Sequence, residues 1–227
     1  MKRGKFIVID GTDGSGKATQ TELLAKKLRK EKYKVKIFDF PQYGQKSAGM
    51  VEEYLNGQYG SAQEVGPYRA SIFYACDRYD ASFKIKKYLR EGKIVISNRY
   101  VTANMGHQGG KIANPQERKK YFKWLYDLEY GIFGIPQPDL NMILHVDAAI
   151  AQKLVDGKDA RSYIKGQKKR DLHEKDLKHL RDAEKVYLEI AKNFPNSCLI
   201  KCTENKNIMT REKISELVWK EIKKVLK

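Results

Sequence analysis

Short apolar runs alternate along this chain with longer segments in which apolar residues recur every three or four positions. The runs that are short and mostly apolar predict five strands, which cover Phe6 to Ile9, Val35 to Phe38, Ile94 to Ser97, Met142 to Val146 and Cys198 to Lys201. Strands that are buried on both faces have this composition, because helices cover both sides of a parallel sheet. The alternation with helical segments is typical of the crossover units that build such a sheet.

Apolar residues with helical spacing predict helices between and after these strands. In chain order they are Leu24 and Leu28, then Ile72, Cys76, Tyr79 and Phe83 in a long helix closed by Gly92, then Leu177, Leu180, Tyr187, Ile190 and Phe194, and finally Ile214, Leu217, Val218, Ile222 and Val225. We find neither an internal repeat nor a Pro/Gly/Ser-rich linker. We therefore expect residues 1–227 to form a single three-layer α/β domain around a five-stranded parallel sheet.

Composition agrees with one domain, since a chain of 227 residues with 41% hydrophobic residues can bury one core. No apolar run approaches the length of a membrane span, and residues 1–5 lead directly into the first strand rather than into a cleavable signal. Cys76, Cys198 and Cys202 are odd in number and lack paired CxxC spacing. We expect free, buried thiols in a reducing compartment, and hence a cytoplasmic protein that does not bind a membrane.

The chain carries a net charge of +17, with 45 Lys and Arg against 28 Asp and Glu. Such an excess attracts polyanions of any kind, from nucleotide phosphates to nucleic acid. Much of it lies where lysines alternate with glutamates, in residues 26–32 and 220–227, a pattern typical of a solvated helix surface. Charge alone therefore does not identify the partner.

The segment after the first predicted strand is rich in glycine and ends in a lysine. Gly11-Thr12-Asp13-Gly14-Ser15-Gly16-Lys17 has the glycine and lysine spacing of a phosphate-binding loop that opens a helix. Glycines let backbone N–H groups converge on phosphate oxygens, and the helix N-terminus adds partial positive charge. An ordinary glycine-rich turn is disfavoured because strand, spacing, lysine and helix all agree. The sequence therefore predicts nucleotide binding, with Lys17 on the β- and γ-phosphates.

The loop departs from its usual pattern at the residue after the lysine. A Ser or Thr there offers its hydroxyl to Mg²⁺, whereas this chain has Ala18. Thr19 does not simply replace it, because adjacent helical residues point about 100° apart at 3.6 residues per turn. No residue of the loop is thus assigned to a metal.

With this loop, four further segments resemble the thymidylate kinases, in that family's order and over nearly the whole chain. The segment Asp39-Phe40-Pro41-Gln42-Tyr43-Gly44 is similar to the family's Phe-Pro turn, with Tyr43 where some relatives place an arginine near the acceptor phosphate. The segment 73–79 is similar to a helix on which an aromatic ring stacks on thymine and an arginine reaches its carbonyl edge. Tyr74 and Arg78 match those positions, and residues four apart share one helix face.

The third segment, Ile96-Ser97-Asn98-Arg99-Tyr100, is similar to the family's Asp-Arg-Tyr or Asp-Arg-His motif. Arg99 matches the residue that holds the acceptor phosphate, for which a permanently charged, bidentate guanidinium is suited. Gln108 matches a residue that pairs with the thymine edge. Asn98 replaces the family's acid, and His107 stands where relatives often place an aromatic ring that disfavours ribose.

The fourth segment, residues 138–147, resembles the family's Pro-Asp-Leu start of the fourth strand and leads into a polar, basic stretch. We expect a small basic lid at about 156–174. Members of the family supply a transition-state arginine from the phosphate loop or from the lid. Because the loop has Gly14, the lid residues Arg161 and Arg170 are the candidates, and such an arginine contributes roughly 10³ to 10⁵ in rate.

The resemblance implies a P-loop kinase that phosphorylates dTMP to dTDP with ATP and Mg²⁺ in dTTP synthesis, and that forms a homodimer. It implies Lys17, Arg99, Arg161 and Arg170 as catalytic residues. It places ATP at Gly11, Asp13, Gly14, Ser15, Gly16, Lys17, Ala18 and Thr19. It places the acceptor at Asp13, Phe40, Pro41, Tyr74, Arg78, Arg99 and Gln108, with Asp13 matching a carboxylate that contacts the 3′-hydroxyl. Mg²⁺ is expected to bind mainly through the ATP phosphates.

Two alternatives stay open at this point. The changes at His107 and Tyr43 permit a kinase for another deoxynucleoside monophosphate. Ala18 and Asn98 permit a catalytically weakened nucleotide-binding protein that regulates a partner or binds nucleic acid through its basic surface. A protein without catalytic demand has no reason to keep the acceptor residues and the cationic lid together, so we do not expect nucleic acid to be a partner.

Overall fold

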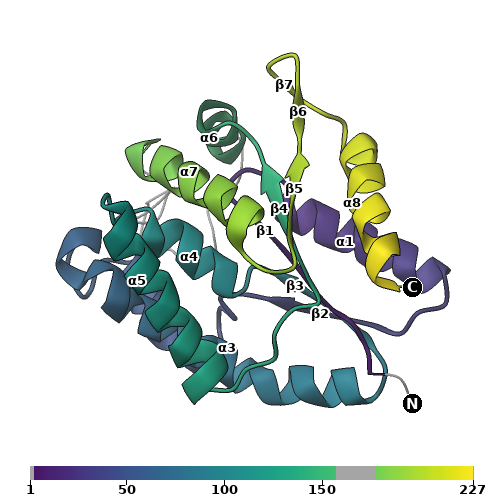
Figure 1. Ribbon diagram of the computed structural model, residues 1–227, viewed down its shortest axis with the longest axis horizontal. Coiled ribbons are helices and arrows are strands. Elements are labelled where there is room, and N and C mark those ends of the chain that lie inside the picture. The colour runs from purple at the N-terminus through teal and green to yellow at the C-terminus, as the bar shows by residue number, and fades with distance from the viewer. Residues whose placement is uncertain (1–2, 157–176, 227) are drawn as a thin grey trace.

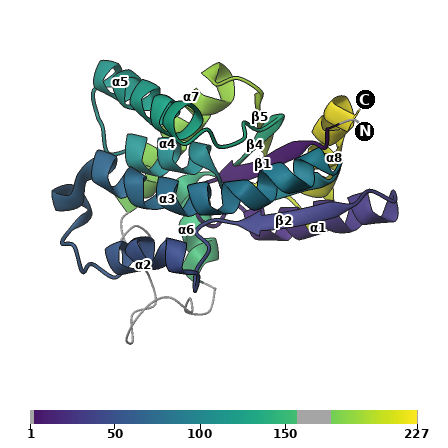
Figure 2. The ribbon, with the colours of Figure 1, turned by 90° about the horizontal axis from the view of Figure 1, so that it is seen from below.

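The computed structural model describes residues 3–156 and 177–226. Its main sheet has five parallel strands in the order β2-β3-β1-β4-β5 (Figures 1 and 2). The strands are β1 (Phe6–Gly11), β2 (Val35–Asp39), β3 (Ile94–Asn98), β4 (Leu140–His145) and β5 (Ser197–Lys201). All of the strands expected from the sequence are confirmed. The bounds differ by at most two residues: β1 ends at Gly11 rather than at Ile9, and β4 begins at Leu140 rather than at Met142.

Helices cover both faces of the sheet, and β1 shows how the two sides are built. Phe6 and Val8 face a core shared with the helices α3, α4, α5 and α7, whereas Ile7 and Ile9 face a core shared with α1 and α8. Side chains alternate between the faces of a strand, so four consecutive apolar residues supply both cores. Figure 1 shows α1 and α8 on one side of the sheet and α3, α4, α5 and α7 on the other. The three layers expected from the sequence are thereby confirmed.

The helices are α1 (Lys17–Lys30), α2 (Gly49–Leu55), α3 (Ala62–Arg90), α4 (Val101–Gly109), α5 (Pro115–Tyr126), α6 (Ala148–Asp156), α7 (Leu177–Asn193) and α8 (Arg211–Leu226). A 3₁₀ turn, η1 (Lys46–Ala48), precedes α2, and a π-helical turn, η2 (Asp127–Ile132), follows α5. The strands β6 (Thr203–Glu204) and β7 (Asn207–Ile208) form a small antiparallel hairpin that the sequence did not predict. None of the helices in the described ranges is long and apolar enough to cross a bilayer.

The long helix α3 is confirmed, but the apolar residues that marked it do not face the core. Ile72, Tyr79 and Phe83 are exposed by 40%, 42% and 58%, and Cys76 is exposed as well. The buried face of α3 carries smaller and polar residues, among them Ser71, Ala75, Arg78, Ser82 and Ile85. The expectation of a buried Cys76 was therefore wrong, because the thiol lies on the face of α3 that is turned away from the sheet. Gly92 follows the helix with φ +73°, as a closing glycine should.

Candidate active site

The glycine-rich loop leaves β1 and opens α1, as the sequence predicted. Within the loop, the Nζ of Lys17 donates hydrogen bonds to the backbone oxygens of Gly11 and Thr12 at 3.0 and 2.9 Å. These bonds hold the lysine over the loop, at the helix N-terminus where phosphate binds best. Gly14 has φ +83°, and a Cβ on it would lie 2.3 Å from the backbone oxygen of Ala151 in α6. A side chain of any size is thus excluded at position 14.

A buried carboxylate ties this loop to two distant helices. Asp10, near the end of β1, is fully buried. Its Oδ1 accepts a hydrogen bond from the backbone N–H of Gly11 at 2.9 Å and another from the hydroxyl of Tyr187 in α7 at 2.8 Å. Its other oxygen accepts from the hydroxyl of Thr102 in α4 at 2.7 Å. The positions of the phosphate loop, α4 and α7 therefore depend on one side chain.

A cavity of about 220 Å³ opens beside the phosphate loop. Its walls come from the loop, from the ends of β2 and β3, and from α2, α3 and α4, which are far apart in the sequence. The lining residues are Asp13, Gly14, Gly16, Lys17, Ala18, Asp39, Phe40, Pro41, Tyr43, Leu55, Tyr74, Arg78, Asn98, Arg99, Ala103, Asn104, His107 and Gln108. The structure therefore brings all of the expected acceptor-binding residues, and most of the expected phosphate-binding residues, to one cavity.

Arg99 lies between the two halves of this cavity. It directly follows β3 with φ +66°, a left-handed conformation that is uncommon for a residue with a side chain and clusters at functional sites. Its guanidinium forms an ion pair with the Asp13 carboxylate, and its other terminal nitrogen lies 2.9 Å from Nε2 of His107. Burial, assisted by the charge of Arg99, holds the pKa of His107 well below its usual range. His107 is consequently neutral, and its Nε2 accepts from the arginine.

A buried ion pair fixes Arg78 on α3. Its Nε and one terminal nitrogen donate to the two carboxylate oxygens of Glu129, both at 2.7 Å, and the side chains are only 1% and 0% exposed. Burial raises the pKa of Glu129, and the guanidinium of Arg78 opposes that rise. Glu129 belongs to the π-helical turn η2, a rare form that often occurs at functional sites. The other terminal nitrogen of Arg78 donates to the backbone oxygen of Tyr100 at 3.4 Å, and the residue lines the cavity.

Tyr74 and Gln108 complete the end of the cavity that lies away from the phosphate loop. The ring of Tyr74 packs against that of Tyr54 with centroids 6.4 Å apart and planes at 89°, an edge-to-face arrangement. Gln108 is almost fully buried, and its Oε1 accepts a hydrogen bond from Lys111 at 2.7 Å. An aromatic face, a guanidinium and an amide therefore converge, which is what recognition of a flat, polar-edged ring requires.

Oxygen atoms that could hold a divalent cation lie at the adjoining ends of β2 and β3. Asp39 and Asn98 are paired in register, and Nδ2 of Asn98 donates to Oδ1 of Asp39 at 2.8 Å. Oδ1 of Asn98 is buried and accepts no hydrogen bond from the described residues. Both residues line the cavity beside Asp13. Carboxylate and amide oxygens are the ligands that Mg²⁺ prefers, so this donor set fits Mg²⁺.

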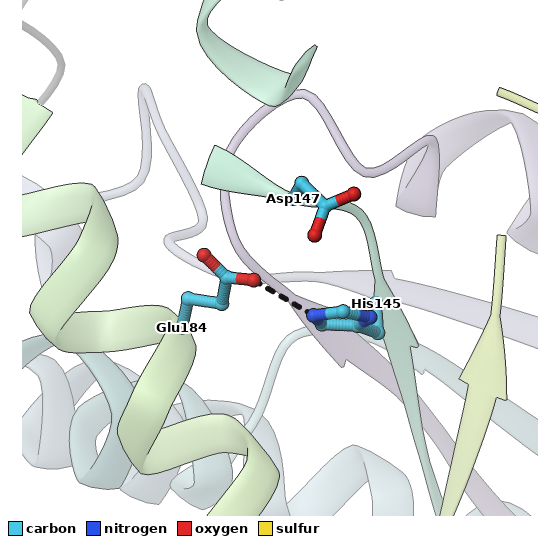
Figure 3. Close-up of side chains that lie close together, drawn as sticks. All are labelled: His145, Asp147 and Glu184. Atoms are coloured by element: carbon cyan, nitrogen blue, oxygen red, sulfur yellow. Dashed lines mark hydrogen bonds and ion pairs between the residues drawn. The ribbon is translucent and has the colours of Figure 1, made fainter. Parts of the chain in front are cut away.

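A second group of potential metal ligands lies outside the cavity lining, at the end of β4. His145, Asp147 and Glu184 have ligand atoms within 4.8 Å of one another (Figure 3). Glu184 of α7 already accepts from Nε2 of His145 at 2.8 Å and from the backbone N–H of Ala148 at 3.1 Å. One of its oxygens thus holds the end of β4 and the other holds the start of α6. We assign this group a structural role.

The structure also separates some of the expected residues. Gly11, Ser15 and Thr19 do not line the cavity, although they belong to the same loop and helix. The expected lid arginines, Arg161 and Arg170, lie outside the described residues.

Several residues of the site were missed by the sequence reasoning. Asp39, Leu55, Ala103 and Asn104 line the cavity, and Glu129 supports it from behind. Asp39 was visible as the residue before the Phe-Pro turn, whereas no pattern pointed to Glu129.

Comparison with known proteins gives consistent results. The family model described as thymidylate kinase matches residues 9–214. The chain is 30% identical over 187 residues to the thymidylate kinase of Mycobacterium tuberculosis (strain CDC 1551 / Oshkosh), covering 82% of this chain and 85% of that protein. It is 27% identical over 151 residues to the thymidylate kinase of Schizosaccharomyces pombe, covering 66% and 65%. The solved structure of thymidylate kinase from Candida albicans superimposes with a TM-score of 0.75 at 21% identity, covering 98% of this chain and 92% of that one. The last likeness shows a shared fold, which confirms the expected P-loop architecture.

Proposed function

Because this chain belongs to the thymidylate kinase family, we propose that it transfers the γ-phosphate of ATP to dTMP and releases ADP and dTDP. The observation that carries the proposal is the single cavity that joins the phosphate loop to Arg99, Tyr74, Arg78 and Gln108. Such a cavity can hold a donor phosphate and a monophosphate side by side. In the transfer, an oxygen of the acceptor phosphate bonds to the γ-phosphorus as the bond to the β-phosphate oxygen breaks.

This chemistry asks the protein to align the two substrates and to spread the charge that develops, without a covalent intermediate. Lys17 and the backbone N–H groups of the loop bind the ATP phosphates. Arg99 clamps the acceptor phosphate, and its contacts with Asp13 and His107 fix its direction before the substrate arrives. Asp13 accepts from the 3′-hydroxyl of the acceptor. The lid arginines, Arg161 and Arg170, remain the proposed source of further positive charge.

The base is held at the other end of the cavity. Tyr74 offers a ring for stacking, while Arg78 and Gln108 offer polar groups to the edge of the base. Phe40 and Pro41 form part of the wall between the base and the phosphates. Glu129 holds the guanidinium of Arg78 so that its direction does not depend on the substrate.

Mg²⁺ bound to ATP would supply positive charge next to the phosphates. Asp39 and Asn98 are the residues that would hold it, because their side chains are in contact and both line the same cavity. Ala18 has no hydroxyl to add. Asn98 has an amide instead of a carboxylate, and the neighbouring Asp39 supplies the carboxylate for the metal site.

The test of this function is ATP-dependent diphosphate formation with Mg²⁺ across dTMP, dUMP, dCMP, dGMP, UMP and AMP. We expect dTMP to be the preferred acceptor and Lys17→Ala to abolish turnover, because the lysine is held over the loop that is proposed to bind the donor phosphates. Preference for another monophosphate would reassign the acceptor. Absence of turnover with ATP binding retained would contradict the proposal and favour a regulatory nucleotide-binding protein.

We also propose that the protein is a cytoplasmic homodimer that pairs through the exposed apolar face of α3. Ile72, Cys76, Tyr79 and Phe83 recur at helical spacing along this face and are all exposed, and apolar residues gathered on one exposed face are typical of an interaction site. A second copy presents the same face, so one patch can form a closed two-fold interface.

Sedimentation measures the oligomeric state directly. We expect a dimer for the wild type and a monomer for Phe83→Glu, which places a charge at the most exposed ring of this face. Tyr33→Glu is the matched control, because Tyr33 is also an exposed aromatic residue, at 41% against 58% for Phe83, but follows α1 on the other side of the sheet. A wild type that sediments only as a monomer at assay concentrations would contradict the dimer and leave the kinase proposal intact.

A further inference from the structure

Lys111 is a partly buried cation behind the base end of the cavity. It lies just after α4, and its Nζ donates hydrogen bonds to Oε1 of Gln108 and to the hydroxyl of Tyr54, both at 2.7 Å. Among residues 3–156 and 177–226, no carboxylate forms an ion pair with it. Burial lowers the pKa of Lys111 from 10.5 to about 7. A lysine desolvated in this way opposes folding, so its contacts need an explanation beyond packing.

The first contact fixes the direction of an amide. Nζ of Lys111 donates to the side-chain oxygen of Gln108, and a protonated lysine has only donors, so Nε2 of the amide faces the other way. Gln108 lines the cavity, and its Nε2 forms no hydrogen bond with the described residues. The group that Gln108 can offer to a ligand is therefore a donor.

The second contact supports the stacking ring. Tyr54 of α2 is fully buried, and its ring meets that of Tyr74 edge to face. Lys111 thus touches both Gln108 and the residue against which Tyr74 packs. Two of the three side chains proposed to read the base are connected through this lysine.

We propose that Lys111 is a positioning residue that sets base selectivity by making Gln108 present a hydrogen-bond donor to the base edge. This inference rests on the proposed function, since it assumes that Gln108 and Arg78 face the base. Arg78 also has donors only, so the edge that they read must accept. Thymine and uracil carry a carbonyl oxygen at C4, whereas cytosine carries an amino group there that would face donors without a partner.

The experiment compares wild type with Lys111→Met, which keeps an unbranched apolar stem and removes every donor. Dissociation constants and kcat/KM are measured for dTMP, dUMP and dCMP. We expect the preference for dTMP over dCMP to fall by at least about tenfold, because the freed amide can turn its oxygen toward an amino group. The preference for dUMP over dCMP should fall by a similar factor. Both changes should appear in KM rather than in kcat. A dTMP to dCMP ratio unchanged within about twofold overturns the proposal.

Two further comparisons separate this role from a general effect of charge or packing. Lys185→Met removes the same charge from an exposed lysine on α7 near Lys111, and should leave the ratio unchanged. In a Gln108→Ala background, Lys111→Met should add no further change if it acts through Gln108. An equal fall in the Lys185 variant, or a further fall in the Gln108→Ala background, overturns the assignment.

The two proposals fail in different ways. A wild type that neither binds nor phosphorylates dTMP refutes the proposed function and this inference with it. A wild type that phosphorylates dTMP, with the same base preference in Lys111→Met, refutes the role of Lys111 alone.

Discussion

Replacing Glu129 with glutamine removes the counter-charge of Arg78 while keeping the shape of the side chain. Both partners are almost completely buried, and both hydrogen bonds are 2.7 Å long. Breaking such a pair by neutralising one partner costs about 3–5 kcal/mol, because the other charge stays buried without compensation. With an m-value of about 2 kcal/mol/M, a loss of about 4 kcal/mol lowers the urea midpoint by about 2 M. We therefore expect a large, easily measured fall in the stability of Glu129→Gln.

The same change should weaken binding of the acceptor. Without Glu129, the guanidinium of Arg78 loses its fixed direction, so we expect KM for dTMP to rise more than kcat falls. Urea unfolding followed by circular dichroism and steady-state kinetics measure the two effects. The control is Glu117→Gln, which breaks an exposed pair with Lys120 and should leave the urea midpoint unchanged.

A paired variant tests the reasoning itself. Arg78→Met combined with Glu129→Leu removes both charges together, and replacing a buried pair by apolar residues is often neutral or stabilising. We expect the double variant to be more stable than Glu129→Leu alone, although it should not recover dTMP binding. Two results would show that the pair is not desolvated as described. One is a urea midpoint that moves by less than about 0.3 M in Glu129→Gln. The other is a double variant that is less stable than both single variants.

Three further outcomes follow from the same site. Gly14→Ala should lower the stability and the ATP affinity more than Gly16→Ala does. Both glycines have a positive φ, but only at Gly14 would a Cβ lie against a backbone atom, the oxygen of Ala151 at 2.3 Å. Equal effects of the two substitutions would contradict this. Lys111→Met should stabilise the protein most below pH 7, by at most on the order of 5 kcal/mol, because the wild type buries a charged lysine there. Between the folded pKa of Lys111, about 7, and its ordinary value of 10.5, the unfolded state binds more protons than the folded state, so the gain shrinks as the pH rises and vanishes near pH 10.5. Thermal unfolding at both ends of this range would refute the prediction if the gain does not vary. Asp39→Asn should raise the Mg²⁺ concentration for half-maximal velocity by about tenfold, and Asn98→Asp should lower it. Calorimetric titration of Mg²⁺ into the nucleotide-bound protein measures the same affinity without turnover. An unchanged Mg²⁺ affinity in both variants would show that these residues do not belong to the metal site.

The strands and the phosphate loop were predictable because their causes are local. Four consecutive apolar residues in β1 can only be buried on both faces, and the glycines before Lys17 match a conformation that few other sequences adopt. The face of α3 was not predictable in the same way. A helix that carries apolar residues on one side and Ser71, Ala75 and Arg78 on the other does not reveal which side meets the sheet, because apolar surface also serves interfaces.

The support of the site was out of reach for the sequence because it depends on contacts between distant segments. Glu129 lies 51 residues from Arg78 and in an irregular turn, so no spacing relates the two. The pairing of Asp39 with Asn98 follows from the register of two strands that only the folded sheet establishes. The residues that touch substrates carry motifs, whereas the residues that orient them are recognised only after folding.

The carboxylate of Asp10 gives the two halves of the site a common reference point. The loop for the donor phosphates begins at Gly11, whose N–H donates to one oxygen of this carboxylate. The helix that carries His107 and Gln108 begins one residue before Thr102, whose hydroxyl donates to the other oxygen. Thermal displacement of one half is therefore transmitted to the other, so the spacing between donor and acceptor fluctuates less than either position does by itself. In-line transfer tolerates movement of the whole site but not a change in the spacing between donor and acceptor. A shared anchor restricts changes in this spacing and still permits the whole site to move.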